Sequence, residues 1–204
     1  MSDPPLVHLI DDDEAVRNSL SFLLEMNDLA AKTYPSAVEF LQTVAADTLQ
    51  SGCIVTDVRM PEMNGLELVR RLKEQGVQLP VIVITGHGDV PLAVEAMRAG
   101  VVDFIEKPFE DDTLLNSIRS ALNTQPDSDP QDAERQRFEE LLSSLSGRER
   151  EVLRGVVAGK LNKQIAYELG ISPRTVEVYR ANVMSKTRAN GLSDLVRMAL
   201  LAGF

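Results

Sequence analysis

Polar residues that can do chemistry stand close behind four short apolar runs, at residues 6–10, 53–55, 79–84 and 101–105. These polar residues are Asp11, Asp12, Asp57, Thr85 and Lys107. If the runs are parallel strands, their carboxyl ends meet at one edge of a sheet and bring these side chains together. Three ionised carboxylates need a counter-charge, and a hard divalent cation with oxygen ligands usually supplies it. The spacing therefore predicts a magnesium site beside a lysine and a hydroxyl group.

Asp57 is the predicted reactive group of this set. As a nucleophile it can form an aspartyl phosphate, while magnesium, Lys107 and Thr85 neutralise charge on the transferred phosphoryl group. Magnesium prefers one or two carboxylates together with water, which fits direct ligation by Asp12 and Asp57, with Asp11 acting partly through water. Taken singly, these residues have ordinary explanations: a loop carboxylate, a surface lysine and a helix-capping threonine. Five of them at one edge favour the reactive interpretation.

The elements that must position these residues alternate along the first part of the chain. Strands are predicted at residues 6–10, 29–33, 53–57, 79–84 and 101–105. Helices are predicted from about residues 16–24, 37–46, 66–72, 90–99 and 111–122. The strands are apolar throughout rather than alternating, which is typical of burial on both faces. Because parallel strands need helical crossovers, the predicted fold is α/β, with a five-stranded, doubly wound, flavodoxin-like parallel sheet.

Residues 144–204 are predicted to form a small all-α domain. Ser146 and Glu149 make a capping box that opens its first helix. Further on, Gly170 makes a turn between a short helix and a longer one, and Ser172-Pro173 supplies the N-cap and first residue of the longer helix. A helix, a tight glycine turn and a capped helix form the helix-turn-helix signature.

A linker and a change of charge separate the two halves. Residues 124–143 begin with linker composition, and one or two helical turns are expected from Glu134 to Leu142. The whole chain has a net charge of −10. Residues 1–124 hold 9 basic and 20 acidic residues, a net charge of −11, whereas residues 144–204 hold 10 and 5, a net charge of +5. Only the second half is therefore expected to meet a polyanion. The predicted domains are 1–123 and 144–204, with 124–143 as the linker.

Composition also bears on the compartment. Cys53 is the single cysteine, so no intramolecular disulfide is possible and a reducing compartment fits. No apolar segment approaches the roughly 20 residues that cross a bilayer, so no membrane partner is expected. The first residues lack the basic and then apolar layout of a signal peptide. A cytoplasmic location is therefore expected.

The ordered motifs of both halves resemble a known family. Residues 5–123 are similar to the receiver domain of two-component response regulators, through Asp11-Asp12, Asp57, Thr85 and Lys107-Pro108. Ser146 to Phe204 resembles the LuxR-type helix-turn-helix, and the combination is that of the NarL/FixJ group. The stretches at residues 85–91 and 104–110 carry this likeness most clearly. Each motif alone is moderately specific, whereas the ordered set is highly specific.

The resemblance implies roles for the residues of the acidic edge. Asp57 is implied as the phosphoacceptor for a sensor histidine kinase, with Asp11, Asp12 and the backbone carbonyl of Arg59 as further Mg²⁺ ligands. Thr85 and Phe104 are implied as a switch pair, although Phe104 can also be plain core filler. A cis peptide bond before Pro108 is implied as well.

The resemblance also divides the DNA-facing residues into two groups. Those implied near base edges are Glu177, Val178 and Ala181. Those implied nearer phosphates are Lys163, Arg174, Thr175, Tyr179, Arg180 and Lys186. Glutamate can accept from a cytosine amino group and valine can meet a thymine methyl, so the chemistry allows this division. Glu177 departs from the lysine frequent there in the family, and a salt bridge to a neighbouring arginine explains it equally well.

The expected function is therefore that of a response regulator. Phosphorylation is expected to promote a homodimer and sequence-specific binding to promoter DNA, activating transcription by RNA polymerase. The resemblance suggests nitrogen-fixation or microaerobic genes as targets. The chain is not expected to be an enzyme, although it can assist its own phosphotransfer and dephosphorylation.

Two other functions explain parts of the sequence. A magnesium phosphatase of the haloacid dehalogenase kind also forms an aspartyl phosphate, but it needs a second carboxylate two residues after the nucleophile. Arg59 stands at that position, so the general acid is missing. A receiver joined to a protein-binding helical module is disfavoured by the +5 charge of residues 144–204.

Overall fold

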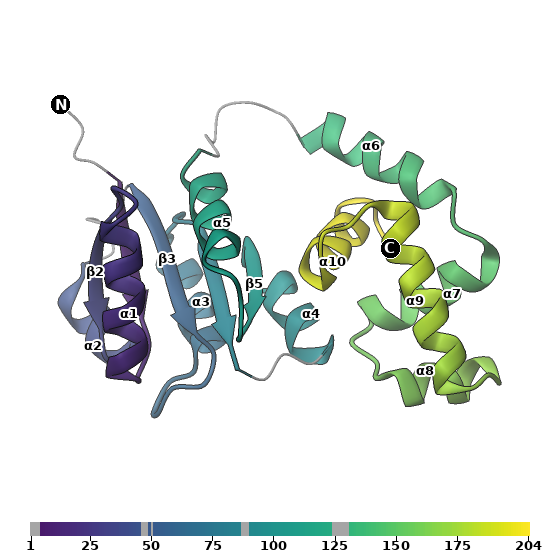
Figure 1. Ribbon diagram of the computed structural model, residues 1–204, viewed down its shortest axis with the longest axis horizontal. Coiled ribbons are helices and arrows are strands. Elements are labelled where there is room, and N and C mark those ends of the chain that lie inside the picture. The colour runs from purple at the N-terminus through teal and green to yellow at the C-terminus, as the bar shows by residue number, and fades with distance from the viewer. Residues whose placement is uncertain (1–4, 46–48, 50, 87–89, 124–130) are drawn as a thin grey trace. The chain divides into compact units, whose positions relative to one another are not determined.

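The computed structural model describes residues 5–45, 49, 51–86, 90–123 and 131–204 (Figure 1). The chain packs as two compact units, one of residues 1–88 and 99–125 and the other of residues 89–98 and 126–204. Residues 87–89 of the motif at 85–91, the first residues 1–4, and residues 124–130 of the predicted linker lie outside the described residues. Each unit is described by itself below.

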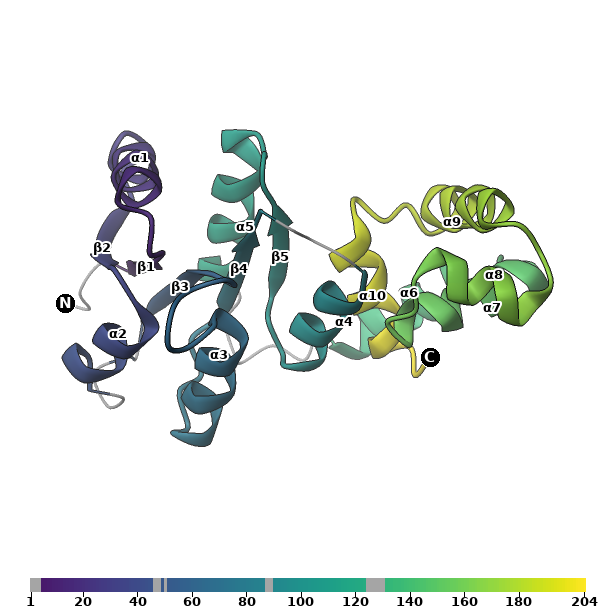
Figure 2. The same cartoon turned by 90° about the horizontal axis from the view of Figure 1, so that it is seen from below.

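The first unit is built on a five-stranded parallel sheet. Its strands are β1 (Leu6–Ile10), β2 (Ala30–Tyr34), β3 (Gly52–Asp57), β4 (Val81–Thr85) and β5 (Asp103–Glu106). They lie in the order β2-β1-β3-β4-β5, which Figure 2 shows nearly edge-on. Nearly every residue of β1, β3 and β4 is buried, because helices cover both faces. The predicted doubly wound sheet is confirmed.

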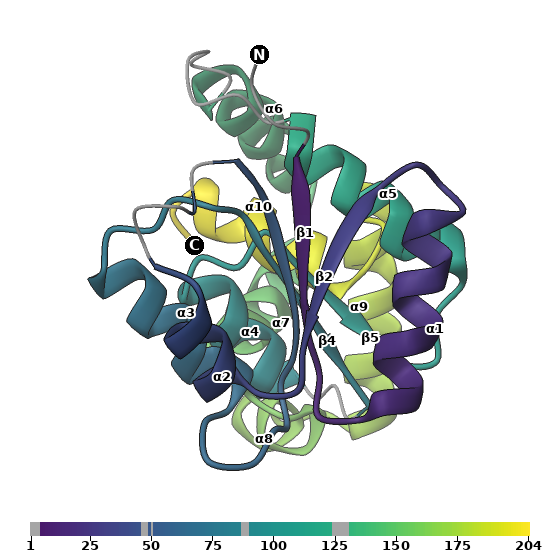
Figure 3. The same ribbon diagram turned by 90° about the vertical axis from the view of Figure 1, so that its left-hand side faces the viewer.

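Helices pack on both faces of this sheet. They are α1 (Glu14–Glu25), α2 (Ala37–Thr43), α3 (Gly65–Glu74) and α5 (Asp111–Asn123). Figure 3 shows α1 and α5 on one face and α2 and α3 on the other. Side-chain oxygens of Asp13, Ser36 and Asn64 cap the first three helices by accepting backbone N–H bonds. The helix α4 (Val90–Arg98) groups with the second unit, whereas the sequence pattern placed it within residues 1–123.

Ser117, on α5, is expected to weaken the first unit. Among the described residues, its hydroxyl oxygen is the buried side-chain polar atom that has no hydrogen-bond partner. Ser117→Ala is expected to raise the free energy of unfolding by about 1 kcal/mol, because it removes an unsatisfied buried group. Urea unfolding of the full chain measures this, with Ser19→Ala on the exposed face of α1 as the control for helix propensity. An equal gain in both variants would contradict the burial argument.

The second unit contains the predicted helix-turn-helix. Besides α4 it comprises α6 (Gln131–Ser143), α7 (Gly147–Val157), α8 (Asn162–Leu169), α9 (Pro173–Thr187) and α10 (Leu192–Leu201). Both halves of the capping box between Ser146 and Glu149 are present at the start of α7. Gly170 ends α8 in the left-handed conformation with φ 65°, which a residue without a Cβ adopts at low cost. Ser172 then caps α9, as predicted.

The helix α6 is longer than the sequence pattern indicated. One or two turns were expected after a linker, yet α6 runs over 13 residues. Phe138 and Leu142 are 7% and 2% exposed, and Leu142 belongs to the apolar cluster formed with α7, α9 and α10. The helix is otherwise mostly polar, so its own sequence carries a weak amphipathic pattern. Packing of Phe138 and Leu142 against the other helices of the second unit stabilises α6. No described helix has the length and apolar character needed to cross a membrane.

Candidate functional sites

The predicted acidic edge exists as a set of direct contacts. Asp57 is the last residue of β3, while Asp11 and Lys107 follow directly after β1 and β5. The Nζ atom of Lys107 lies 2.9 Å from Oδ2 of Asp11 and 2.9 Å from Oδ1 of Asp57. Adjacent parallel strands end at the same edge, so residues 46 to 96 positions apart in the chain meet here. The lysine joins both carboxylates.

The remaining carboxylate oxygens are held by the backbone. The amide of Arg59 donates to Oδ2 of Asp57 at 2.6 Å, and the amide of Asp13 donates to Oδ1 of Asp11 at 2.9 Å. The guanidinium of Arg17 donates to the backbone carbonyl of Asp11 at 2.7 Å. Both carboxyl groups are buried, with Asp11 3% and Asp57 8% exposed. Their orientations are therefore fixed before any ligand arrives.

Burial and charge act in opposite directions on this site. Burial raises the pKa of Asp57, and the nearby charge of Asp11 adds to the rise, against the lowering effects of Lys107 and the Arg59 amide. Burial by itself lowers the pKa of Lys107, but its bonds to Asp11 and Asp57 outweigh burial and raise that pKa. The lysine is thus held in its charged form, beside a carboxylate that is costly to ionise.

The other predicted residues of this edge lie nearby with different exposures. Thr85 is fully buried as the last residue of β4, and its backbone carbonyl accepts a 2.7 Å bond from the amide of Lys107. Phe104 is half-buried on β5, in register with Val83 of β4. Asp12 is exposed. The peptide bond between Lys107 and Pro108 is cis, as the resemblance implies.

Gly65 contributes to the site in a way that the sequence analysis missed. Its amide donates a 2.9 Å bond to the carbonyl of Val58, at the start of α3. A side-chain carbon at this position would collide with the backbone carbonyl of Asp57. The glycine therefore lets α3 begin directly against the reactive residue. The available signal was the pair Asn64-Gly65, an N-cap followed by a residue without a side chain.

The chemistry of this edge suits a magnesium ion. Asp11, Asp12 and Asp57 carry three negative charges when ionised, and Lys107 neutralises one of them. A divalent cation would neutralise the other two. Within the described residues, no three His, Cys, Asp or Glu side chains are grouped so that they could hold a metal. Magnesium needs only one or two carboxylates beside water and phosphate oxygens, so the oxygen donors here fit it.

The stability of the first unit should depend on the charge of Asp57. Because its folded-state pKa is raised, the stabilising contribution of its neutral form is complete at low pH and lost as pH rises through that pKa. Without metal, Asp57→Asn is therefore expected to raise the urea midpoint at about pH 7 but hardly at about pH 3. Magnesium at about ten times its dissociation constant should stabilise the wild type by about 1.4 kcal/mol and the variant less. Equal pH profiles would contradict this.

The recognition helix α9 divides its side chains between the core and the surface. Val176 and Val183 are buried. Arg174 and Val178 are exposed, with Val178 50% exposed. Tyr179 is half-buried against the apolar cluster of the second unit, so only part of its ring is accessible. Lys163 and Ala181 are exposed, and Thr175 is half-buried.

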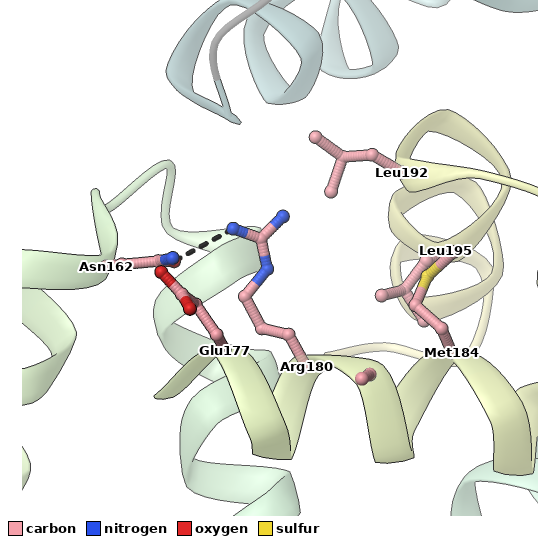
Figure 4. A pocket seen from close by; sticks show the side chains of 7 residues that line it. Asn162, Glu177, Arg180, Met184, Leu192 and Leu195 are labelled. Carbon is pink, nitrogen blue, oxygen red and sulfur yellow. Dashed lines mark hydrogen bonds between the residues drawn. The ribbon is translucent and has the colours of Figure 1, made fainter. Parts of the chain in front are cut away.

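Two predicted DNA contacts are already engaged within the unit. Arg180 is half-buried and donates a 2.8 Å bond to Oδ1 of Asn162, as Figure 4 shows, and burial lowers its pKa. It was expected to face outward. Lys186 lies 2.7 Å from the carboxylate of Glu149, which is 4% exposed. Because position 180 follows the buried Val176 by one helical turn, its side chain packs toward α8.

The alternative role of Glu177 has support. Its carboxylate lies 2.9 Å from the guanidinium of Arg174, one turn earlier on α9. It also lines a cavity of about 340 Å³ in the second unit. The other lining residues are Asn162, Arg180, Ala181, Met184, Leu192 and Leu195 (Figure 4). The salt bridge that the sequence left open against base contact is thus formed.

Known families and proteins match both units. Residues 7–119 match the response regulator receiver domain, and residues 143–199 match the luxR family of bacterial regulatory proteins. The chain is 55% identical to the transcriptional regulatory protein FixJ of Azorhizobium caulinodans over 197 residues, 97% of this chain and 92% of that protein. It is 54% identical to FixJ of Rhizobium meliloti over 200 residues, 97% of this chain and 96% of that protein.

A solved structure agrees with this likeness over the whole chain. The crystal structure of full-length FixJ from B. japonicum matches with a TM-score of 0.57 and 50% sequence identity. The match covers 99% of this chain and 98% of that one. These matches cover both parts of the chain. One part is the parallel sheet with its lysine-bridged carboxylates, and the other contains the capped recognition helix. The chain therefore belongs to the two-component response regulators that join a receiver domain to a LuxR-type DNA-binding domain, and it is a transcription regulator of the FixJ type.

Proposed function

We propose that Asp57 accepts a phosphoryl group from a histidine of a sensor kinase. The observation that carries this proposal is the position of Lys107, whose ammonium group bonds both Asp57 and Asp11 at 2.9 Å. A site that only stabilises the fold has no need for two buried carboxylates that share one cation. The same arrangement suits an incoming phosphoryl group, because the lysine can bond its oxygens as they approach.

The residues of the chain divide the work of the transfer. A carboxylate oxygen of Asp57 attacks phosphorus, the bond from phosphorus to the kinase histidine breaks, and its electron pair stays on the histidine nitrogen. Lys107 neutralises charge on the phosphoryl oxygens, and the Thr85 hydroxyl bonds one of them. Asp11, Asp12, Asp57 and the Arg59 carbonyl are the proposed ligands of Mg²⁺, which when bound supplies further positive charge to those oxygens. The same residues assist later hydrolysis of the aspartyl phosphate.

Mass spectrometry after incubation with a small acyl phosphate and magnesium tests this function. We expect one phosphoryl group per chain, located on Asp57 and absent from Asp57→Asn. Asp28→Asn, which changes an exposed carboxylate elsewhere on the receiver, serves as the matched control and should be labelled like the wild type. A label on another residue, or none in ample magnesium, would refute the assignment. Rapid multiple turnover of phosphate esters would favour the phosphatase alternative.

We infer that phosphorylation acts through a switch at Thr85 and Phe104. If Thr85 moves to bond the phosphoryl group, the space it leaves can take Phe104, which changes the surface at β5. A shift from 1:99 to 99:1 needs about 5.5 kcal/mol, which phosphate contacts and dimer contacts can supply together. Sedimentation of the full chain with a phosphate analogue should give a dimer. A monomer at high concentration would rule out this switch.

We propose that the dimer binds promoter DNA through α9 and activates RNA polymerase in the cytoplasm. Its targets would be nitrogen-fixation or microaerobic genes, in keeping with the FixJ resemblance. Glu177, Val178 and Ala181 are proposed near base edges, and Lys163, Arg174, Thr175 and Tyr179 near phosphates. Glu177→Ala should change base preference, whereas Lys163→Ala should weaken binding to all sequences alike. Gel shifts with site variants at several salt concentrations separate these outcomes, and equal losses for both variants would overturn the division.

A further inference from the structure

The basic side chains of the DNA-binding unit are mostly committed to partners inside it. Residues 144–204, all of which are described, hold ten lysines and arginines. Eight of them contact a carboxylate, a carbonyl, an amide oxygen or an aromatic ring. These eight are Arg148, Arg150, Arg154, Lys160, Arg174, Arg180, Lys186 and Arg197. Within this part of the chain, Lys163 and Arg188 are left without such a partner.

Arg188 has an unusual backbone conformation for an arginine. It directly follows α9 and has φ 55° and ψ 27°, which is the left-handed region that favours glycine. Its side chain is exposed and adds nothing to the core. The preceding Thr187 is 1% exposed, and its hydroxyl bonds the carbonyl of Val183 at 2.8 Å, so this end of the helix is held firmly. A Cβ in this conformation costs conformational free energy that glycine would avoid.

The length of α9 bears on what Arg188 can reach when the helix enters a major groove. A helix of 15 residues is about 22 Å long, whereas the major groove is about 12 Å wide. When the first turns of a recognition helix contact base edges, its far end extends beyond the groove toward the sugar-phosphate backbone. An exposed arginine without an internal partner at that end has the charge and geometry to bond a phosphate.

We propose that Arg188 contacts a DNA phosphate at the end of the recognition helix, and that its left-handed backbone is retained for this contact despite the cost in stability. This residue lies outside the set that the family resemblance implies. Within residues 144–204, the other basic residue without an internal partner is Lys163, at the start of α8. It can also neutralise a DNA phosphate and release counterions. Arg180 and Lys186 contribute less, because the first is bonded to Asn162 and the second to Glu149.

Arg188→Gly tests the proposal because stability and DNA affinity should change in opposite directions. Binding of the full chain to a fluorescent duplex of unrelated sequence is measured by anisotropy across a range of NaCl concentrations. The slope of log K against log salt should become shallower by about 0.9, with affinity about eightfold lower at 0.1 M and about fourfold lower at 0.2 M. The urea midpoint of the same variant should rise, because the backbone strain is relieved.

Three control variants separate this contact from general effects. Arg188→Lys should keep the wild-type salt slope. Arg148→Gln removes an exposed, paired arginine from α7 and should leave the slope unchanged. Asp28→Gly relieves a similar left-handed residue, with φ 59°, in the receiver and should raise stability without changing DNA affinity. The proposal is overturned if Arg188→Gly keeps the wild-type slope, if Arg148→Gln loses as much, or if Arg188→Gly lowers the urea midpoint.

Discussion

Lys107→Ala is expected to slow phosphorylation of Asp57 by a small acyl phosphate about 100-fold, the scale seen when one preorganised donor to a developing charge is removed. The ammonium group bonds both buried carboxylates, so its loss leaves the anionic phosphoryl donor facing Asp11 and Asp57 without that positive charge. The loss also removes a charge that lowers the pKa of Asp57, so a smaller fraction of Asp57 is in the nucleophilic, ionised form. The rate is measured by quenched-flow mass spectrometry at saturating magnesium.

Two further variants identify what the lysine supplies. Lys107→Arg keeps a positive charge but changes its shape, and should recover only part of the rate. Lys73→Ala removes an exposed lysine from the last turn of α3, so it controls for net charge and should react like the wild type. Circular dichroism checks that each variant is folded. Unchanged labelling kinetics in Lys107→Ala would show that the lysine serves the fold rather than the transfer.

Lys186→Met is expected to lower the free energy of unfolding of the DNA-binding unit by about 2 kcal/mol. Breaking a buried ion pair leaves an uncompensated charge, here the carboxylate of Glu149, which also accepts a 2.7 Å bond from the Ser146 amide. This expected loss is smaller than the loss usual for buried ion pairs, because the Lys186 side chain is 41% exposed and water can replace part of the interaction. Urea unfolding followed by helical circular dichroism measures the loss.

The pH dependence of this pair has a definite sign. The bonds from Lys186 and the Ser146 amide lower the pKa of Glu149 in the folded state. Its stabilising contribution is therefore present above the ordinary pKa of 4.5 and lost as pH falls through the lowered folded-state pKa. The effect of Lys186→Met should accordingly shrink in acid. The double variant Glu149→Gln with Lys186→Met should recover part of the loss, and a full additive loss would argue against coupling of the two residues.

The DNA salt slope gives an independent check on Lys186. The family resemblance places this residue near phosphates, whereas its bond to Glu149 gives it a structural role. If Lys186 keeps its bond to Glu149 when DNA is bound, Lys186→Met should leave the salt slope close to that of the wild type. The slope is measured at a temperature at which the variant is folded. Arg148→Gln, which breaks an exposed pair on the neighbouring helix α7, should change neither slope nor stability appreciably.

The amino-acid sequence by itself determined the features that depend on local patterns. Continuous apolar runs predicted the buried strands, because a strand covered on both faces has no need for alternation. Side-chain caps at Ser146 and Ser172 marked two helix starts, since the capping bond is made within three residues. Asp57 was singled out because the run from Cys53 ends there. These patterns depend only on residues that are close in the chain, so they can be read without knowing the tertiary structure.

Only the tertiary structure decided how distant residues pair. Lys107 can bond Asp11 and Asp57 only because β1 and β5 end at the same edge as β3, and Glu149 meets Lys186 only because α7 packs on α9. The inward turn of Arg180 and the full length of α6 likewise depend on neighbouring helices. Bonds between residues far apart in the chain depend on packing that no local pattern records. The sequence thus identified the reactive groups, whereas the fold decided which of their charges remain free to act.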